Sequence, residues 1–355
     1  MGHFQEGFSM ARKIAVIPGD GIGPEVIRPA VDVLKHLQPG FELDMFDLGA
    51  ERYLKDGTTM PPELMASLKD GVYDAVLLGA LGDPRVPGNE PAHDILLGCR
   101  FGLDLFVNHR PVRLLVPRYS PLKTASGIDM TIFRENTEGE YVGMGGTMRK
   151  GLPDEIATEL SVATRHGVVR IIEYAFMWAQ QNGKRRVCCA TKANAQPETG
   201  GVWMRAFRDI SARYPRIDAR HMYIDAVAAQ MVLHPEDFDV IVTSNLFGDI
   251  ITDLGAAIAG SMGLAASGNI NPAGIGLFEP VHGSAPDIAG KGIANPMAAI
   301  LSVGMMFAHM KLPELAEKVE NAVTACLEES IVTQDLSGTY TTVEVGNAVL
   351  QKLVE

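Results

Sequence analysis

Two aspartates four residues apart in the segment 241–253 are placed to bind a divalent metal ion. The segment opens with β-branched apolar residues, typical of a buried strand, and changes to helical periodicity after two residue types that commonly cap helices. Asp249 and Asp253 then project from one face of the helix, where two like charges repel unless a cation lies between them. Mg²⁺ and Mn²⁺ favour such oxygen ligands. The alternative is a solvated helix face, but residues 254–260 are too apolar and too small for one.

Three arginines close to apolar runs form a second candidate group. Arg100 lies at the end of one run and Arg134 lies at the end of another. Arg110 follows a strand-like run that Pro111 interrupts. A single arginine in such a place is most often a surface residue with its aliphatic part on apolar neighbours. Three of them instead suggest a pocket for a substrate with several carboxylates, because a guanidinium group binds a carboxylate through two parallel hydrogen bonds.

Lys192 and Asp225 follow two further strand-like runs, 186–190 and 219–224. Proteins with parallel sheets bind ligands at the carboxyl ends of their strands. Taken singly, each of these residues is more often a surface charge. With Asp249 and Asp253 they place one lysine and three aspartates at strand ends or just beyond them.

The segment 277–296 is rich in glycine and proline and is predicted to be a loop. Its free backbone N–H groups and polar side chains suit the phosphate and ribose groups of a nucleotide. His282 lies in this loop, although an isolated histidine is more often structural. The earlier glycines of Gly19-x-Gly21-x-Gly23 do not form a Rossmann fingerprint, because Pro24 follows and no acidic residue closes the next strand at the expected offset.

Strands that alternate with helices along the chain predict an α/β fold with a largely parallel sheet. Two segments are predicted to lack regular structure: 79–95, a long loop, and 261–292, which has little periodicity. Gly143 to Glu155 is predicted to be an arm that clasps another subunit, or else a surface loop. The predicted strands are 13–17, 41–46, 73–78, 186–190, 219–224 and the start of 241–253, and the predicted helices are 25–37, 61–68, 163–181, 198–214, 226–233, 296–310, 314–329 and 343–353.

The 355 residues are too many for one compact core, so two domains are expected. The net charge of −12 argues against a nucleic-acid or anionic-membrane partner. Four cysteines without metal-ligand spacing predict buried thiols and a cytoplasmic protein. No membrane span or signal peptide is apparent, and Met10 is an alternative start to Met1.

Together these residues resemble the β-decarboxylating dehydrogenases, which act on isopropylmalate, isocitrate, homoisocitrate, tartrate or D-malate. The resemblance runs from the early glycine turn to the C-terminal helices. Its specific blocks are Asn108-His-Arg110-Pro, Arg134-Glu-Asn-Thr-Glu-Gly-Glu-Tyr141, Thr191-Lys192, Ser244-Asn-Leu-Phe-Gly-Asp249-Ile-Ile-Thr-Asp253 and Glu279-Pro-Val-His282-Gly-Ser-Ala-Pro-Asp287.

The resemblance implies a two-domain isocitrate/isopropylmalate dehydrogenase-like fold with a non-Rossmann cofactor site. Residues 1–108 with 261–355 would bind the cofactor, and 109–260, with an arm at about 142–160, would bind substrate and metal and form the dimer. Arg100, Arg110 and Arg134 match the substrate arginines, and Asp225, Asp249 and Asp253 match the ligands of Mg²⁺ or Mn²⁺. Lys192 and Tyr141 match the catalytic base and acid. Lys192 and Asp225 would come from the partner subunit of a homodimer, so the active site would be shared.

The resemblance also implies which residues bind the cofactor and which nucleotide it is. NADP-dependent relatives carry a lysine and a tyrosine where this chain has Asp287 and Ile288. A carboxylate accepts a hydrogen bond from a ribose 2′-hydroxyl and repels a 2′-phosphate, so NAD is expected. The full set of expected cofactor residues is Ile22, His282, Gly283, Ser284, Ala285, Asp287, Ile288 and Asn295.

The substrate is expected to be a 3-substituted malate, and its C3 group is expected to lie against Leu96 and Leu97. Two leucines suit an alkyl group, as in 3-isopropylmalate. The block after Arg134 looks more like that of tartrate or D-malate enzymes, and His93 stands where a glutamate is expected, so a D-malate, tartrate, homoisocitrate or isocitrate type stays open. Two other classes are a non-catalytic regulatory subunit, in which metal aspartates or the lysine are usually lost, and a metal-dependent phosphatase or aldolase, which would not bind NAD.

Overall fold

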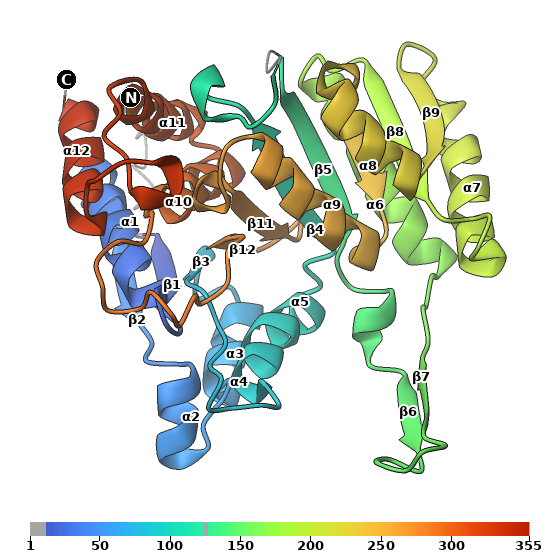
Figure 1. Cartoon of the computed structure of the whole chain (residues 1–355), viewed down its shortest axis with the longest axis horizontal. Helices are drawn as coiled ribbons and strands as arrows, with labels where there is room; N and C mark the ends of the chain where they lie inside the picture. The colour runs from blue at the N-terminus through green and yellow to red at the C-terminus, as the bar shows by residue number, and fades with distance from the viewer. Residues whose placement is uncertain (1–11, 124–126, 355) are drawn as a thin grey trace, which may run out of the picture.

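The computed structural model describes residues 12–123 and 127–354, and a ten-stranded sheet runs through them (Figure 1). Its strand order is β2-β1-β3-β12-β11-β4-β5-β10-β8-β9, so it spans both predicted domains without a break. The choice between Met1 and Met10 lies outside the described residues. The strands are β1 Lys13–Ile17, β2 Glu42–Met45, β3 Ala75–Leu78, β4 Val107–Arg113, β5 Asp129–Glu135, β8 Arg186–Thr191, β9 Asp218–Tyr223, β10 Val240–Thr243, β11 Ala266–Ile270 and β12 Gly276–Pro280.

The sheet is largely parallel, as the alternation of strands and helices predicted. Its centre is the exception, because β11 runs antiparallel to both β12 and β4, and β4 runs antiparallel to β5. The prediction that 261–292 lacks regular structure was therefore wrong for β11 and β12. Both are fully buried, and they mix polar and small residues, so neither shows the apolar run of an ordinary inner strand.

Helices cover both faces of the sheet. One face packs against α1 Gly23–Leu37, α6 Arg165–Gln181, α7 Pro197–Ser211, α10 Met297–His309, α11 Pro313–Glu328 and α12 Thr342–Val354. The other face packs against α3 Pro62–Lys69, the helical segment that ends in α5 Gly98–Gly102, α8 Ile224–Leu233 and α9 Asn245–Ile258. The remaining helices are α2 Ala50–Asp56 and α4 Glu90–Ala92.

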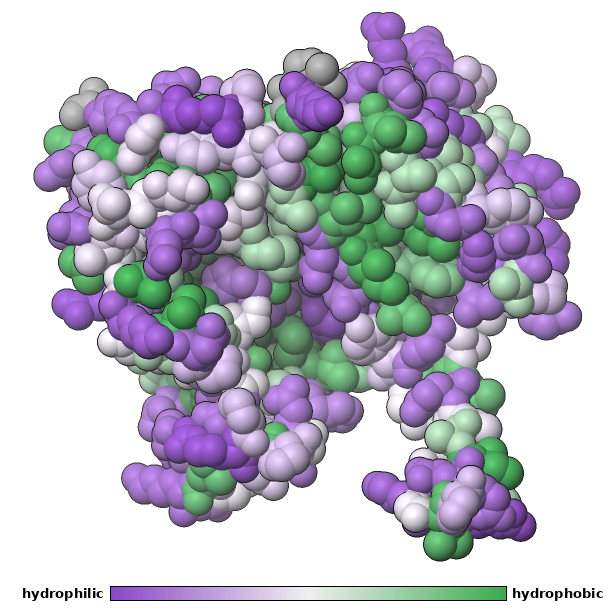
Figure 2. All heavy atoms as spheres, viewed as in Figure 1, coloured by the Kyte–Doolittle hydropathy of each residue, from purple (hydrophilic) through white to green (hydrophobic). Residues whose placement is uncertain are grey.

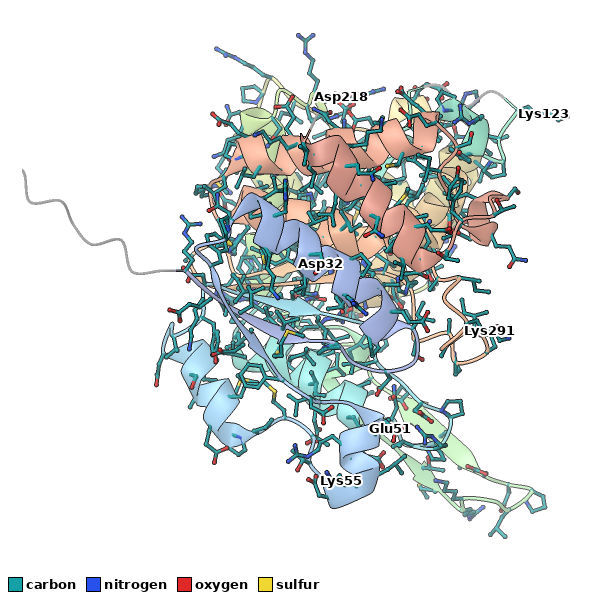
Figure 3. The ribbon with its side chains drawn as sticks, turned by 90° about the vertical axis from the view of Figure 1, so that its left-hand side faces the viewer. Asp32, Glu51, Lys55, Lys123, Asp218 and Lys291 are labelled. Atoms are coloured by element: carbon teal, nitrogen blue, oxygen red, sulfur yellow. The ribbon has the colours of Figure 1, made fainter. Side chains whose placement is uncertain are left out.

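The segment 79–95, which was predicted to be a long loop, lacks regular structure only as far as Asn89. From Glu90 the chain forms α4, then a π-helical turn His93–Leu97, then α5. Figure 3 shows the molecule from the side, with the exposed charges of α1 and α2 (Asp32, Glu51 and Lys55) and Lys291 at the outer edge of the segment 281–296.

Pro111 lies inside β4 and does not end it, which corrects the expected interruption. Pro111 lacks a backbone N–H, so it fits only where the strand needs no donor on that side. β11 pairs with β4 only from Val107 to His109, and beyond that point β4 has β5 alone as its hydrogen-bonded neighbour.

A two-stranded hairpin, β6 Gly145–Met148 and β7 Ile156–Glu159, projects from the body of the molecule (Figure 1). All of its residues are exposed, and it falls within the predicted arm. It carries several exposed apolar side chains, Met144, Met148, Leu152, Ile156 and Leu160.

The four cysteines are buried thiols and form no disulfide, as expected. Among the described residues, no helix has the length and apolar character needed to cross a membrane.

Candidate active site

The three predicted substrate arginines line one cleft of about 430 Å³. Arg100 comes from α5, Arg110 from β4 and Arg134 from β5, and each is at most 6% exposed. The alternation of side chains along a strand explains why Arg110 and Arg134 share one side of the sheet, the face that packs against α9. Their neighbours His109 and Phe133 point to the other face.

The arginine cluster is strongly electropositive. Burial and, to a smaller extent, the charge of Arg134 together lower the pKa of Arg100 and of Arg110 to about 10. The guanidinium groups keep their protons at neutral pH, but each is held close to the others with little water around it. Such a group of cations is stabilised by an anion with more than one carboxylate.

Asp249 provides a negative charge inside this cluster. It forms an ion pair with Arg134 and lies 3.6 Å from Arg110, and Tyr141 Oη donates a 3.1 Å hydrogen bond to it. Burial alone would raise the pKa of Asp249, but the two guanidinium charges and the tyrosine hold it below its usual value. Burial raises the pKa of Asp253, one helical turn away, and Arg110 opposes that rise in part.

Lys192 and Asp225 do not reach the cleft within one chain. They form an ion pair with each other, with 2.5 Å between Nζ and Oδ1, and neither lines the pocket that holds the arginines. Within 12–123 and 127–354, no three His, Cys, Asp or Glu side chains are close enough together to hold a metal ion. The three predicted metal aspartates are thus split: Asp249 lines the cleft, Asp253 lies one turn further along α9 without lining it, and Asp225 is apart from both.

The predicted cofactor loop is attached to the N-terminal glycine turn. Ile22 N donates to Ser284 O at 2.9 Å, and a Cβ on Gly21 would lie 2.1 Å from the same oxygen. Only glycine therefore fits at position 21, where φ is +55°. The carboxylate of Glu25 accepts hydrogen bonds from the backbone N–H groups of Gly290 and Gly292.

Individual residues of the loop have different surroundings. His282 lines the arginine cleft, and burial lowers its pKa, so the imidazole is neutral at neutral pH. Asp287 is exposed, whereas Ile288 is half-buried. Asn295 Nδ2 donates to Asp335 at 3.1 Å, which ties the end of the loop to the segment before α12.

Known proteins resemble this chain over nearly its whole length. A sequence model of the isocitrate/isopropylmalate dehydrogenases matches residues 13–349. The chain is 45% identical to the 3-isopropylmalate dehydrogenase of Thermobifida fusca, over 97% of this chain and 98% of that protein. It is 47% identical to that of Nocardia farcinica, over 95% and 98%. The chain belongs to the isocitrate/isopropylmalate dehydrogenase family.

Two solved structures share the fold of this chain. The isocitrate dehydrogenase of Methylococcus capsulatus superposes with a TM-score of 0.89 at 35% identity, covering 97% of this chain and all of that one. The TT0538 protein of Thermus thermophilus gives a TM-score of 0.87 at 36% identity, over 97% of this chain and 68% of its own. The predicted resemblance and fold class are confirmed, and the protein is a decarboxylating dehydrogenase that acts on a CH–OH donor.

Several residues that position the site were not identified from the sequence motifs. Asp20 is buried and accepts backbone hydrogen bonds from Ala50 at 2.7 Å and from Gly82 at 2.9 Å. Thr252 Oγ1 accepts from Arg110 Nη1 at 2.5 Å and donates to the Asp249 carbonyl at 2.9 Å. Its position three residues after Asp249 could have identified it, since the two share a helix face.

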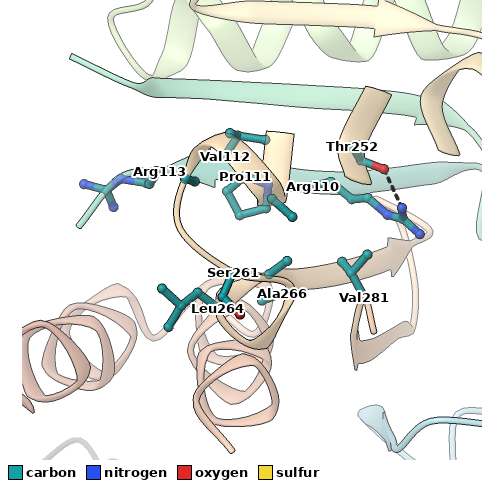
Figure 4. Close-up of a pocket in the computed structure, with 12 residues that line it drawn as sticks. Arg110, Pro111, Val112, Arg113, Thr252, Ser261, Leu264, Ala266 and Val281 are labelled. Carbon is teal, nitrogen blue, oxygen red and sulfur yellow. Dashed lines mark hydrogen bonds between the residues drawn. The ribbon is translucent and has the colours of Figure 1, made fainter. Parts of the chain in front are cut away.

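Figure 4 shows the wall behind Arg110, where the Arg110–Thr252 hydrogen bond closes one side of a small cavity. Pro111, Leu264 and Val281 are among its lining residues. Its volume is about 20 Å³, whereas sites for small organic molecules usually measure a few hundred Å³. The substrate-sized space therefore lies on the other side of Arg110, in the arginine cleft.

Proposed function

We propose that this protein is a 3-isopropylmalate dehydrogenase that uses NAD and Mg²⁺ or Mn²⁺. The convergence of Arg100, Arg110 and Arg134 in one cleft carries this proposal, because a malate has two carboxylates to bind. Leu96 and Leu97 line the same cleft and offer an apolar wall to the isopropyl group. The relatives named 3-isopropylmalate dehydrogenase, at 45% and 47% identity, support the same substrate.

The donor set fits a divalent cation if a second copy completes it. Asp249 is kept ionised by its arginine neighbours, and Asp253 follows one turn later on α9. The third oxygen donor would be Asp225 of another protomer, with Lys192 brought in beside it. Arginines around Asp249 would oppose a cation on their own, but a bound dicarboxylate would neutralise them.

The loop 281–296 fits NAD. Position 283 is a glycine with no atom within 4 Å of where a Cβ would stand, so a ligand can approach its backbone closely. His282 Nε2 is buried and has no hydrogen-bond partner among the described residues. Asp287 is an exposed carboxylate in the same loop, which suits a ribose 2′-hydroxyl and disfavours a 2′-phosphate.

In the proposed reaction, bound NAD⁺ would accept the hydride and the bound cation would draw electron density from the substrate's oxygen atoms. The arginines would hold both carboxylates and fix which carbon faces the cofactor. Lys192 would take the proton of the C2 hydroxyl as general base. After CO₂ has left, Tyr141 would protonate the carbon, and its 3.1 Å contact with Asp249 orients the phenol towards the cleft.

A homodimer would be the active unit. The outer face of α8 and α9 carries exposed Leu233 and Ile250, at 64% and 60%, and Figure 2 shows a continuous apolar area over these helices. An apolar area on a charged protein marks an interaction surface. The exposed apolar side chains of the β6–β7 hairpin would add a second contact. Because the four cysteines are thiols, we place the dimer in a reducing compartment, the cytoplasm.

A D-malate or tartrate dehydrogenase is the second candidate. His93 and Asn89 line the cleft beside the leucines, and both offer polar groups to a hydroxyl-bearing C3. A panel of 3-isopropylmalate, D-malate, tartrate, isocitrate and homoisocitrate separates the candidates. Reduction of NAD⁺ with Mn²⁺ should be fastest on 3-isopropylmalate. Faster turnover of D-malate or tartrate would select the second candidate, and absence of NAD⁺ binding would reject both.

A further inference from the structure

A buried amide, Asn269, lies at the junction of the arginine cleft and the strand that leads into the cofactor loop. It belongs to β11, whose neighbours on either side are β12 and β4. Asn269 is fully buried and does not line the cleft, so it is not placed to touch the substrate.

Three donors converge on its carbonyl oxygen. Oδ1 of Asn269 accepts from Arg100 Nε at 3.0 Å, from Asn108 Nδ2 at 3.1 Å and from Asn136 Nδ2 at 2.9 Å. These partners come from α5, from β4 and from the residue that follows β5, so one oxygen links three segments. This convergence also fixes the orientation of the amide, because a flipped Asn269 would put its NH₂ group against three donors.

The other end of the amide holds Glu279. Asn269 Nδ2 donates to Glu279 Oε1 at 2.7 Å, and that oxygen lies 3.5 Å from Arg100 Nη2. Both Glu279 and Arg100 line the cleft. The carboxylate is thus close enough to lower the electrostatic cost of the buried arginine, but it does not form the two-pronged ion pair that a free glutamate and arginine favour.

We propose that Asn269 is a positioning residue that keeps the Arg100 guanidinium available to a substrate carboxylate. Its carbonyl holds Nε, which leaves the two Nη groups turned to the cleft, and its NH₂ group holds Glu279 back from them. Without Asn269, Glu279 would close on Arg100 and occupy the fork that the substrate needs. This inference rests on the proposed function for the role of Arg100, but the geometry it describes can be tested without substrate.

The first measurement is kinetic. Asn269→Ala should raise the KM for 3-isopropylmalate by about ten- to a hundredfold, the cost of one or two charge-assisted hydrogen bonds, with the KM for NAD⁺ within about threefold of wild type. Asn271→Ala is the matched control, since this amide lies just beyond β11, donates to Leu103 O and does not touch Arg100. An unchanged substrate KM in a folded Asn269→Ala protein would overturn the proposal.

The second measurement needs neither substrate nor activity. The Arg100 Nε–H signal, assigned by its loss in Arg100→Lys, should exchange slowly with water in the wild type and rapidly in Asn269→Ala. Asn269→Asp keeps the acceptor and should keep the slow exchange, but it lacks the NH₂ group that holds Glu279. If the alanine variant does not fold, the substrate KM of Asn269→Asp carries the test: it should rise at least tenfold, and an unchanged KM would overturn the proposal. Equal protection of Arg100 Nε–H in wild type and Asn269→Ala would refute the positioning role. If 3-isopropylmalate is no substrate of the wild type, the proposed function fails while this measurement still decides the inference.

Discussion

At the scale of single residues, Arg110 combines burial, charge and a fixed partner. Thr252 holds Nη1 from one side, and the side chain packs against the small cavity of Figure 4. Nε is buried without a hydrogen-bond partner among the described residues, and the side chain lines the cleft. A lysine would keep the charge but present a single point of contact instead of a planar fork.

Arg110→Lys should therefore lower kcat/KM by about ten- to a hundredfold in steady-state assays, because at least one charge-assisted hydrogen bond to the substrate is lost. Arg113→Lys is the control on the same strand. Arg113 is partly exposed and pairs with Glu320 at the surface, so its exchange should change kcat/KM by less than about twofold. Equal effects of the two substitutions would remove Arg110 from the substrate site.

His109, unlike Arg110, is a titratable side chain that its surroundings keep uncharged. It points away from the cleft and packs against the rings of Phe133 and Trp178, which also contact each other. Burial lowers its pKa to about 4, below the value of about 6.5 for an exposed histidine. The unfolded chain therefore binds more protons than the folded one between these pH values, so this residue makes the protein lose stability as the pH falls from 6.5 to 4.

Chemical denaturation between pH 6.5 and pH 4 should show the contribution of His109 to the free energy of unfolding. Wild type should lose about 2–3 kcal/mol more than His109→Gln between pH 6.5 and pH 4, because the glutamine carries no proton to bind. His282 and His309, whose pKa values burial also lowers, contribute to both proteins and cancel in the difference. His36→Gln, at an exposed position of α1, should keep the wild-type slope, and a His109→Gln slope equal to wild type would contradict the assignment.

At the scale of elements, the position of α9 on the sheet depends on Gly248. A Cβ at this position would lie 2.6 Å from both Cβ and Cγ of Arg134, a contact that real side chains do not make. The glycine precedes Asp249, so any shift of the helix moves the carboxylate and the Arg134 guanidinium together.

Gly248→Ala should cost about 1–3 kcal/mol in free energy of unfolding, through overpacking, and should lower kcat at least tenfold by displacing Asp249. Gly98→Ala is a matched helix glycine with no atom within 4 Å of the added Cβ. It should leave activity intact and leave stability unchanged or slightly raised. A fully active Gly248→Ala protein would show that α9 tolerates the shift.

The elements also show where sequence reasoning succeeded and where it failed. β1 is a continuous apolar run and α6 has helical periodicity, and their observed bounds agree with the predicted ones to within two residues. β11 and β12 were missed because tight packing removes their apolar signal. An added Cβ at Gly276 would lie 2.7 Å from the ring of Phe278, so only glycine fits at that position, and a Cβ at Gly268 would lie 3.1 Å from the same ring, which is a tight contact. On the other face stand Asn269 and Glu279, whose polarity serves the cleft.

The residues of the site divide in the same way, into those that the sequence identified and those that it could not identify. Motif order led to the arginines, the aspartates, Lys192 and Tyr141, whose roles stay predictions. Asn269 could not be found in this way, because its importance depends on a convergence of three segments that no spacing within one segment reveals. Asp335 is a further case, since it meets Asn295 across 40 positions of sequence.

At the scale of the whole molecule, Lys192 and Asp225 lie apart from the arginine cleft of their own chain, so under the proposed function they would serve the cleft of a second copy. If the site is shared, a Lys192→Ala protein and an Asp249→Asn protein damage different halves of it. A mixed dimer would then contain one site with an intact lysine from one protomer and an intact aspartate from the other, and one site with neither.

Co-refolding the two inactive variants in equal amounts should therefore restore roughly a quarter of wild-type activity, because half of the dimers are mixed and each has one intact site. Each variant refolded alone is the control and should remain inactive. Activity that stays at the background level in the mixture, with mixed dimers shown by differently tagged chains, would place the whole site within one chain.

The short helical segment that contains the π-helical turn His93–Leu97 carries side chains with two different proposed roles. Under the proposed function, Arg100, which follows that turn, would hold a substrate carboxylate, whereas Leu96 and Leu97 would meet the group by which the candidate substrates differ. A π turn amounts to one extra residue in an α-helix. Removing that residue would rotate everything before Arg100 by about 100° around the helix axis and present a new set of side chains to the cleft. A change of substrate is thus open to this fold through the loss or gain of a single residue, without any change in the residues that perform the reaction.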